Sequence, residues 1–170
     1  VINMSFGGSN ISIAVEEALE NAYNTSVLVA AAGNDGACNN LGSPACLVKK
    51  VSYPAALPYV IGVMSTDKDG KHTSSFSNYD HYPYDSIEYE VFAVGEGVGS
   101  TWPSNKYACL NGTSMAAPTV AGIAVAVLVC TLLGVLIEGL AYKPLRGVPS
   151  LAVLITAIGM SYFLQNVAQL

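Results

Sequence analysis

The pattern of apolar and polar positions in the first part of the chain predicts a strand, a helix and a second strand. Residues 12–23 carry apolar side chains on one helical face, at Val15, Leu19 and Ala22. The glutamates of this segment lie toward its N-terminal end, where the helix dipole favours them, and Asn24 offers a left-handed stop. Short apolar runs at residues 1–5 and 27–31 flank the helix, which predicts a parallel, right-handed βαβ unit.

Beyond this unit the pattern predicts a further strand at residues 59–65, followed by a turn at residues 67–70. The two aspartates of that turn, Asp67 and Asp69, could suggest a calcium-binding site. Their spacing lacks the remaining oxygen ligands of a calcium loop, so a solvated turn is the favoured interpretation. We therefore expect no metal site here, and the sequence as a whole indicates no cofactor.

The last third of the chain carries two long apolar stretches without a charged residue, at residues 120–137 and 151–170. The second has about the length of a bilayer-spanning helix, roughly 20 residues. Lys143 and Arg146 lie in the short segment between the stretches and predict a cytoplasmic connection. The alternative for the first stretch is a buried core helix, which we accept for residues 119–124. For the rest we expect two transmembrane helices and contact with a membrane through residues 120–170.

Composition narrows the classes of partner. The 170 residues have a net charge of −5 and contain a single arginine, which argues against nucleic acid as a partner. No Cys-x-x-Cys pair occurs, so a zinc site is not expected. Cys38 and Cys46 bracket a short loop, and either a disulfide of an exported protein or two free thiols fits that spacing.

The string Asn-Gly-Thr-Ser-Met-Ala-Ala-Pro at residues 111–118 carries the strongest chemical signal. Gly112 permits a sharp turn, a helix follows, and Pro118 is expected in the first helical turn, where its missing N–H matters little. Ser114 would then expose its hydroxyl beside the positive end of a helix dipole, as a nucleophile requires. The alternative is that Thr113 or Ser114 only caps the helix. The whole string resembles the nucleophile motif of subtilisin-like serine peptidases.

Two further segments support this resemblance and imply roles for their residues. In the run Ala-Ala-Gly-Asn-Asp-Gly, Asn34 matches the asparagine whose side-chain amide donates to the developing oxyanion. The resemblance further implies a substrate cleft for a peptide or protein, lined by Ser5, Phe6, Gly7, Ala31, Ala32 and Gly33. Without the resemblance, the same residues would be interpreted as turn residues and as small residues packed for steric reasons. Residues 1–123 are therefore expected to form the C-terminal half of an α/β, parallel-sheet subtilisin-like domain, secreted or at the cell surface.

A serine nucleophile needs a general base and an orienting carboxylate, which the resemblance implies lie upstream of the first strand. The histidines of the chain are His72 and His81, and neither lies in a His-Gly-Thr-His context. Both are expected to be exposed loop residues. We therefore expect these 170 residues to be inactive as a serine endopeptidase on their own, with Ser114 and Asn34 as the catalytic residues present.

Residues 124–170 suggest a different protein class. Their apolar helices and the connecting Glu-Gly-Leu-Ala-Tyr-Lys-Pro-Leu-Arg-Gly segment resemble part of an inner-membrane permease of branched-chain amino-acid ABC transporters. The resemblance implies two transmembrane helices joined on the cytoplasmic side, a membrane localisation for this segment, and polar groups at Gln165 and Asn166 within a span. Three hypotheses result: a serine endopeptidase half, a permease fragment, and an inactive fusion of the two.

Overall fold

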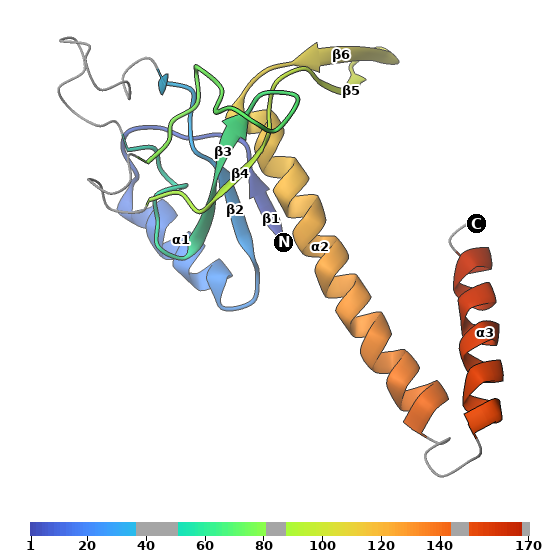
Figure 1. Cartoon of the computed structure of the whole chain (residues 1–170). Helices are drawn as coiled ribbons and strands as arrows, with labels where there is room; N and C mark the ends of the chain where they lie inside the picture. Colours follow the sequence, from blue (N-terminus) through green and yellow to red (C-terminus); the bar gives the residue numbers. More distant parts are fainter. Residues whose placement is uncertain (37–50, 81–87, 144–149, 168–170) are drawn as a thin grey trace. The chain divides into compact units, whose positions relative to one another are not determined.

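The computed structural model describes residues 1–36, 51–80, 88–143 and 150–167 (Figure 1). The chain divides into two compact units, Val1–Val125 and Ala126–Leu170. This division falls close to the predicted boundary between residues 123 and 124, which rests on the two resemblances and remains a prediction. Cys38, Cys46 and His81 lie outside the described residues.

Unit 1 is built on a four-stranded parallel sheet with the strand order β1-β2-β3-β4. The strands are β1 (Ile2–Met4), β2 (Leu28–Ala31), β3 (Val60–Thr66) and β4 (Val91–Val94). Helix α1 (Ile13–Tyr23) joins β1 to β2, whose register pairs Ile2 with Leu28. The predicted α/β class and parallel βαβ unit are therefore confirmed.

Strand β2 is buried on both faces of the sheet, which explains its uninterrupted apolar sequence. Its side chains alternate, so Leu28 and Ala30 pack in a cluster with residues of α1 such as Leu19. Val29 and Ala31 belong to the opposite cluster, which contains the first turns of helix α2 (Thr113–Ile137). The sheet is thus covered by one helix on each face (Figure 1), and β2 ends between them.

Helix α1 begins as a capped helix and ends differently from the prediction. Ser12 has an extended backbone and its side chain accepts the N–H of Val15 at 3.4 Å. Asn24 has φ −60° and ψ −22°, a right-handed conformation, so the predicted left-handed stop is wrong. Its side-chain amide instead donates weakly to the carbonyls of Glu20 and Asn21, which caps the last turn without a change of handedness.

A two-stranded antiparallel hairpin, β5 (Val98–Trp102) and β6 (Lys106–Leu110), leads into α2. Its turn contains two non-glycine residues with positive φ, Ser104 at 66° and Asn105 at 55°. Two successive left-handed residues give a connection whose twist matches that of the strands. The chain then reaches α2 through Asn111 and Gly112.

Pro118 lies inside α2 rather than in its first turn, because the helix already begins at Thr113. The predicted position of Pro118 in the first helical turn is therefore wrong. An α-helix would use the N–H that Pro118 lacks to bond the carbonyl four residues earlier, which belongs to Ser114.

Unit 2 contains the second part of α2, the short π-helix η2 (Glu138–Tyr142) and α3 (Ser150–Val167). The stretch Thr113–Tyr142 is 30 residues long, and its most apolar 18-residue window has a mean hydropathy of 2.9, with 6% of that window buried. Among the described residues it is the one helix with the length and composition of a membrane span. The apolar part of α3, Val153–Asn166, is shorter than such a span.

Candidate active site

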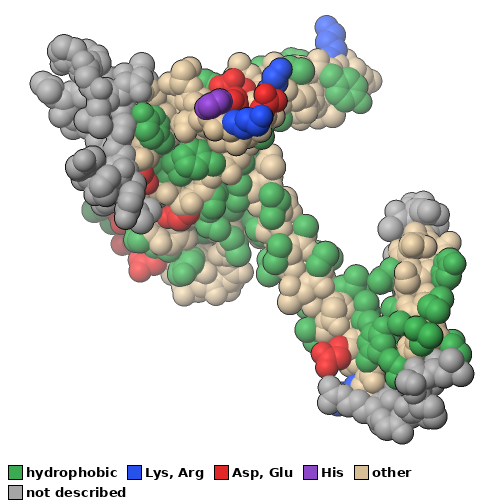
Figure 2. All heavy atoms as spheres, viewed as in Figure 1, with side chains coloured by type: hydrophobic (Ala, Val, Ile, Leu, Met, Phe, Trp, Pro, Cys, Tyr) green, Lys and Arg blue, Asp and Glu red, His purple; other side chains and the backbone are tan. Residues whose placement is uncertain are grey.

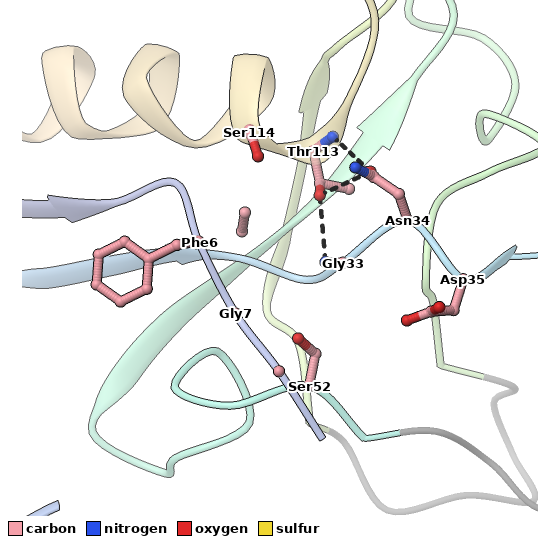
Figure 3. Close-up of a pocket in the computed structure, with 10 residues that line it drawn as sticks. Phe6, Gly7, Gly33, Asn34, Asp35, Ser52, Thr113 and Ser114 are labelled. Atoms are coloured by element: carbon pink, nitrogen blue, oxygen red, sulfur yellow. Dashed lines mark hydrogen bonds between the residues drawn. The ribbon is translucent and has the colours of Figure 1, made fainter. Parts of the chain in front are cut away.

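A cavity of about 240 Å³ opens where β1, β2 and α2 end or begin (Figure 3). Among its described lining residues, Asp35 contributes the one ionisable side chain. Apolar side chains are few, and most of the wall is glycine backbone, hydroxyl and amide groups. The lining residues are Phe6, Gly7, Gly8, Ala31, Gly33, Asn34, Asp35, Ser52, Thr113 and Ser114.

The side chain of Asn34 is held by the first residue of α2. Its Oδ1 accepts the backbone N–H of Thr113 at 2.9 Å and the Thr113 hydroxyl at 3.0 Å. Since an N–H can only donate, this contact fixes which amide atom is the oxygen. Within the part of the chain that the structure describes, the Nδ2 group is therefore left as a free donor toward the cavity.

Two hydrogen-bond donors, one from a side chain and one from the backbone, lie close to Gly112. A Cβ built on Gly112 would stand 3.4 Å from Nδ2 of Asn34 and 3.7 Å from the backbone nitrogen of Ser114. Gly112 has φ +153°, and the absence of a side chain there keeps the space between these two nitrogens open. The side-chain amide nitrogen and the backbone nitrogen of Ser114 therefore both lie within 4 Å of one point beside Gly112.

Neither hydroxyl at the start of α2 serves as a helix cap. The Thr113 hydroxyl bonds Asn34 and also accepts the N–H of Gly33 at 3.2 Å. It thereby ties the loop after β2 to the helix. Ser114 directs its hydroxyl to the backbone carbonyl of Ser5 at 3.0 Å. The capping alternative is wrong for both residues.

Asn78, which sequence reasoning did not single out, clamps the loop that carries Asn34. The side chain is fully buried and donates through Nδ2 to the carbonyl of Ala32 at 2.9 Å. Its Oδ1 accepts the N–H of Asp35 at 2.8 Å. Gly33, with φ +102°, passes so close that a Cβ there would stand 2.6 Å from Nδ2 of Asn78. A buried polar clamp of this kind gives no signal in a hydrophobicity pattern.

The structure brings most of the predicted site residues together. Ser114, Asn34, Phe6, Gly7, Ala31 and Gly33 line the cavity, and Ser5 contacts Ser114 directly. Ala32 does not line it, because the alternation along the strand turns its side chain into the core, where it is fully buried. Its backbone is also bonded elsewhere, because the N–H donates to the carbonyl of Val63 and the carbonyl accepts from Asn78, so Ala32 is not part of the cavity wall.

Four lining residues were absent from the predicted set: Gly8, Asp35, Ser52 and Thr113. Ser52 is held through its backbone N–H, which donates to the hydroxyl of Tyr89 at 3.1 Å. Burial raises the pKa of Tyr89, so this hydroxyl stays protonated. Ser52 comes from a segment distant in sequence from both motifs, and no local pattern marks it.

His72 is exposed and does not line the cavity. It lies in the turn after β3, where Asp67 accepts the N–H of Lys71 at 2.8 Å and that of His72 at 3.3 Å. These hydrogen bonds hold the pKa of Asp67 below its usual value. The residues form a closed surface turn, as predicted, and no group of metal-ligating side chains occurs among the described residues.

A second cavity of about 360 Å³ shares three residues with the first, Phe6, Gly7 and Gly8. It extends along the start of α1, where Ile11, Ser12 and Val15 contribute to its lining. The segment after β1 therefore lines both cavities, which gives an extended chain room to follow it.

A model of the subtilase family matches residues 1–129, so the chain belongs to the subtilase family. Among similar proteins, Subtilisin DY of Bacillus licheniformis is 43% identical over 129 residues, which are 75% of this chain and 42% of that protein. The thermostable alkaline protease of Halalkalibacterium halodurans is 39% identical over 73% of this chain and 30% of that protein.

Among solved structures, the prenylagaramide maturation protease PagA is similar with a TM-score of 0.57 at 30% identity. The match covers 72% of this chain and 41% of that one. The chain therefore spans less than half the length of each of these three relatives.

Proposed function

We propose that unit 1 belongs to a serine endopeptidase that hydrolyses peptide bonds through an acyl-enzyme. Ser114 is the nucleophile in this proposal. The Asn34 amide and the Ser114 backbone N–H donate to the oxyanion that develops as the hydroxyl attacks. The observation that carries the proposal is the fixed orientation of Asn34, whose Oδ1 is bonded to Thr113 while its Nδ2 remains a free donor among the described residues.

The substrate in this proposal is an extended peptide or protein segment. It runs along Ser5, Phe6 and Gly7 after β1, with a side chain in the cavity beside Ala31 and Gly33. Backbone pairing suits such a segment because residues after a strand end leave N–H and C=O groups free to bond an added chain. The similarity to subtilisins is the support for an extracellular or cell-surface site of action in this proposal.

We further propose that the 170 residues do not hydrolyse peptides on their own. The Ser114 hydroxyl donates to a backbone carbonyl, which accepts a hydrogen bond but is far too weak a base to remove the proton. His72, the histidine among the described residues, lies in another part of the surface. The proton acceptor must then come from outside the described residues.

Labelling with a fluorophosphonate probe tests these assignments, with imidazole added as an external base. Without imidazole we expect no labelling of Ser114. Neutral imidazole should raise the labelling rate at least about tenfold, since general-base catalysis contributes about 10²–10⁴-fold when the base is well positioned. Imidazole takes the hydroxyl proton while oxygen bonds to phosphorus and fluoride leaves.

The Ser114→Ala chain is the control and should show no imidazole-dependent label. Strong labelling of Ser114 without imidazole would contradict the missing base. A wild-type chain that labels no faster than Ser114→Ala at any imidazole concentration would contradict the nucleophile assignment.

A membrane segment is the second candidate function, and one observation favours it. Exposed apolar side chains follow one another along α2 beyond Ala121, and the consecutive residues Val127, Leu128 and Val129 point in different directions around the helix axis. In the view of Figure 2, apolar side chains are visible along this helix. A protein partner on one face would leave the others in water, whereas a bilayer surrounds the whole helix. Polar side chains here bond their own helix: Thr131 donates to the carbonyl of Val127, and Asn166 to that of Tyr162, each at 2.8 Å.

Two alternatives remain for this segment within the proposal: a fragment of a branched-chain amino-acid permease, and an apolar tail of an inactive fusion. Both place residues 120–170 in a membrane. They differ in the chain required beyond the second helix, since a permease needs further spans.

A further inference from the structure

The first turn of α2 lacks one of its own hydrogen bonds. Pro118 has no N–H, so the carbonyl of Ser114 receives no helical bond from the residue four positions later. The carbonyl is part-buried, and an unpaired carbonyl in such a position lowers stability. A residue that donates a hydrogen bond to this carbonyl would therefore fix the position of the backbone that carries the Ser114 hydroxyl.

Ser5 fills the gap. Its hydroxyl donates to the Ser114 carbonyl at 2.9 Å, although the two residues are 109 positions apart. The Ser5 oxygen in turn accepts from the side-chain amide of Asn3 in β1 at 3.0 Å. Ser114 returns the contact by donating its own hydroxyl to the Ser5 carbonyl at 3.0 Å. The two serines thus form a reciprocal pair in which each hydroxyl bonds the other residue's carbonyl.

We propose that Ser5 is a positioning residue, whose hydroxyl replaces the helical bond that Pro118 cannot form and so fixes the Ser114 backbone against the end of β1. The consequence for catalysis rests on the proposed function of Ser114. A nucleophile displaced by 1 Å loses about 10²-fold in rate, so an anchor at its own carbonyl matters directly. Ser5 also borders the segment on which a peptide would lie, so the same contact sets the nucleophile relative to the bound chain.

A double-mutant cycle tests the anchor without any need for activity. Ser5→Ala is made in the native chain and in Pro118→Ala, whose new N–H can bond the Ser114 carbonyl. Amide hydrogen exchange of the peptide covering residues 112–122 reports opening of the first helical turns. We expect Ser5→Ala to speed this exchange about fivefold in the native chain, the factor that corresponds to one net hydrogen bond, and less than about twofold in Pro118→Ala.

Ser5→Thr keeps the hydroxyl and should exchange like the native chain. Ser9→Ala removes an exposed serine whose side chain makes no hydrogen bond among the described residues, and it should change nothing. Equal effects of Ser5→Ala in both backgrounds would overturn the anchor, because a packing role does not depend on residue 118. Unchanged exchange in Ser5→Ala would overturn it as well.

The catalytic consequence has its own measurement. In imidazole, Ser5→Ala should slow fluorophosphonate labelling of Ser114 about tenfold, and Ser5→Thr should not. A positive exchange cycle without any labelling of Ser114 would contradict the proposed function and leave the anchor intact. Normal labelling in Ser5→Ala would show that the anchor does not position the nucleophile.

Discussion

At the residue scale, the site depends on how single polar side chains are oriented. The amide of Asn34 is useful as a donor only because Thr113 occupies its oxygen. Sequence comparison with a family can propose Asn34, since it lies in a recognisable string. The same string says nothing of the orientation, which comes from a residue 79 positions away.

This orientation predicts different outcomes for two substitutions of Asn34. Asn34→Ala leaves the N–H of Thr113 without its acceptor and should lower the free energy of unfolding by about 1–3 kcal/mol. Asn34→Asp keeps an acceptor oxygen, so its stability should stay within about 1 kcal/mol of the native chain. Urea unfolding of both variants measures the difference. Equal losses in both would mean that Thr113 does not bond the oxygen.

The raised pKa of Glu90 predicts how the stability of the fold depends on pH. Partial desolvation of its carboxyl group raises its pKa above the ordinary value of 4.5, although the residue is partly exposed and the N–H of Gly62 donates to the carboxylate at 2.6 Å. A raised folded-state pKa adds stability that is complete below pH 4.5 and is lost as pH rises through the folded value. Glu90→Gln should therefore flatten the fall in melting temperature from about pH 4 to about pH 7. Glu17→Gln, on the exposed side of α1, is the matched control; an unchanged slope in Glu90→Gln would contradict the assignment.

At the scale of elements, local patterns predicted most of the parallel sheet. Periodicity found α1, and the apolar runs found β1, β2 and β3, because each of these elements buries a face with its own repeat. The wrong predictions concern positions where a single hydrogen bond determines the local backbone structure. Asn24 follows its helix in a right-handed conformation, and Pro118 lies inside α2, where the Ser5 hydroxyl bonds the carbonyl that the missing N–H would have bonded. Contacts across 109 residues leave no local trace.

The loop after β2 gives the sharpest prediction at this scale. Gly33→Ala places a Cβ at 2.6 Å from Nδ2 of Asn78 on a backbone with φ +102°, so it should destabilise unit 1 by about 2 kcal/mol or more. Gly122→Ala is the matched control in α2, because no atom lies within 4 Å of its added Cβ. It should stabilise the helix by about 0.5–1 kcal/mol. Chemical denaturation compares the two, and a neutral Gly33→Ala would contradict the clamp.

At the scale of the whole molecule, the chain joins a domain of the subtilase family to a strongly apolar helix. Cores of soluble proteins bury such helices, yet 6% of the most apolar window of Thr113–Tyr142 is buried. Exposed Leu132 and Val129 lie in this part, at 67% and 57% exposure. Composition alone predicted this apolar helix, but composition does not show what surrounds the helix.

The proposed bilayer contact predicts the effect of charge in α2. Val129→Lys combined with Leu132→Lys should oppose insertion by about 2.5–3.5 kcal/mol for each lysine and move the chain from carbonate-resistant membranes to the supernatant. Tyr107→Lys adds a lysine at a residue of β6 that is 84% exposed and should leave the distribution unchanged. A native chain that carbonate extracts as readily as the double variant would contradict membrane insertion.

The most direct measurement for the account is the tetrahedral adduct itself. A peptidyl trifluoromethyl ketone offers Ser114 a carbonyl that accepts an alcohol at equilibrium, and ¹⁹F NMR in imidazole buffer distinguishes the bound hemiketal from the free hydrate. We predict a hemiketal signal in the native chain that disappears in Ser114→Ala and weakens in Asn34→Ala, because the amide of Asn34 donates to the new oxyanion. A signal that persists in Ser114→Ala, or a native chain that forms none, would contradict the assignment of Ser114 as the nucleophile.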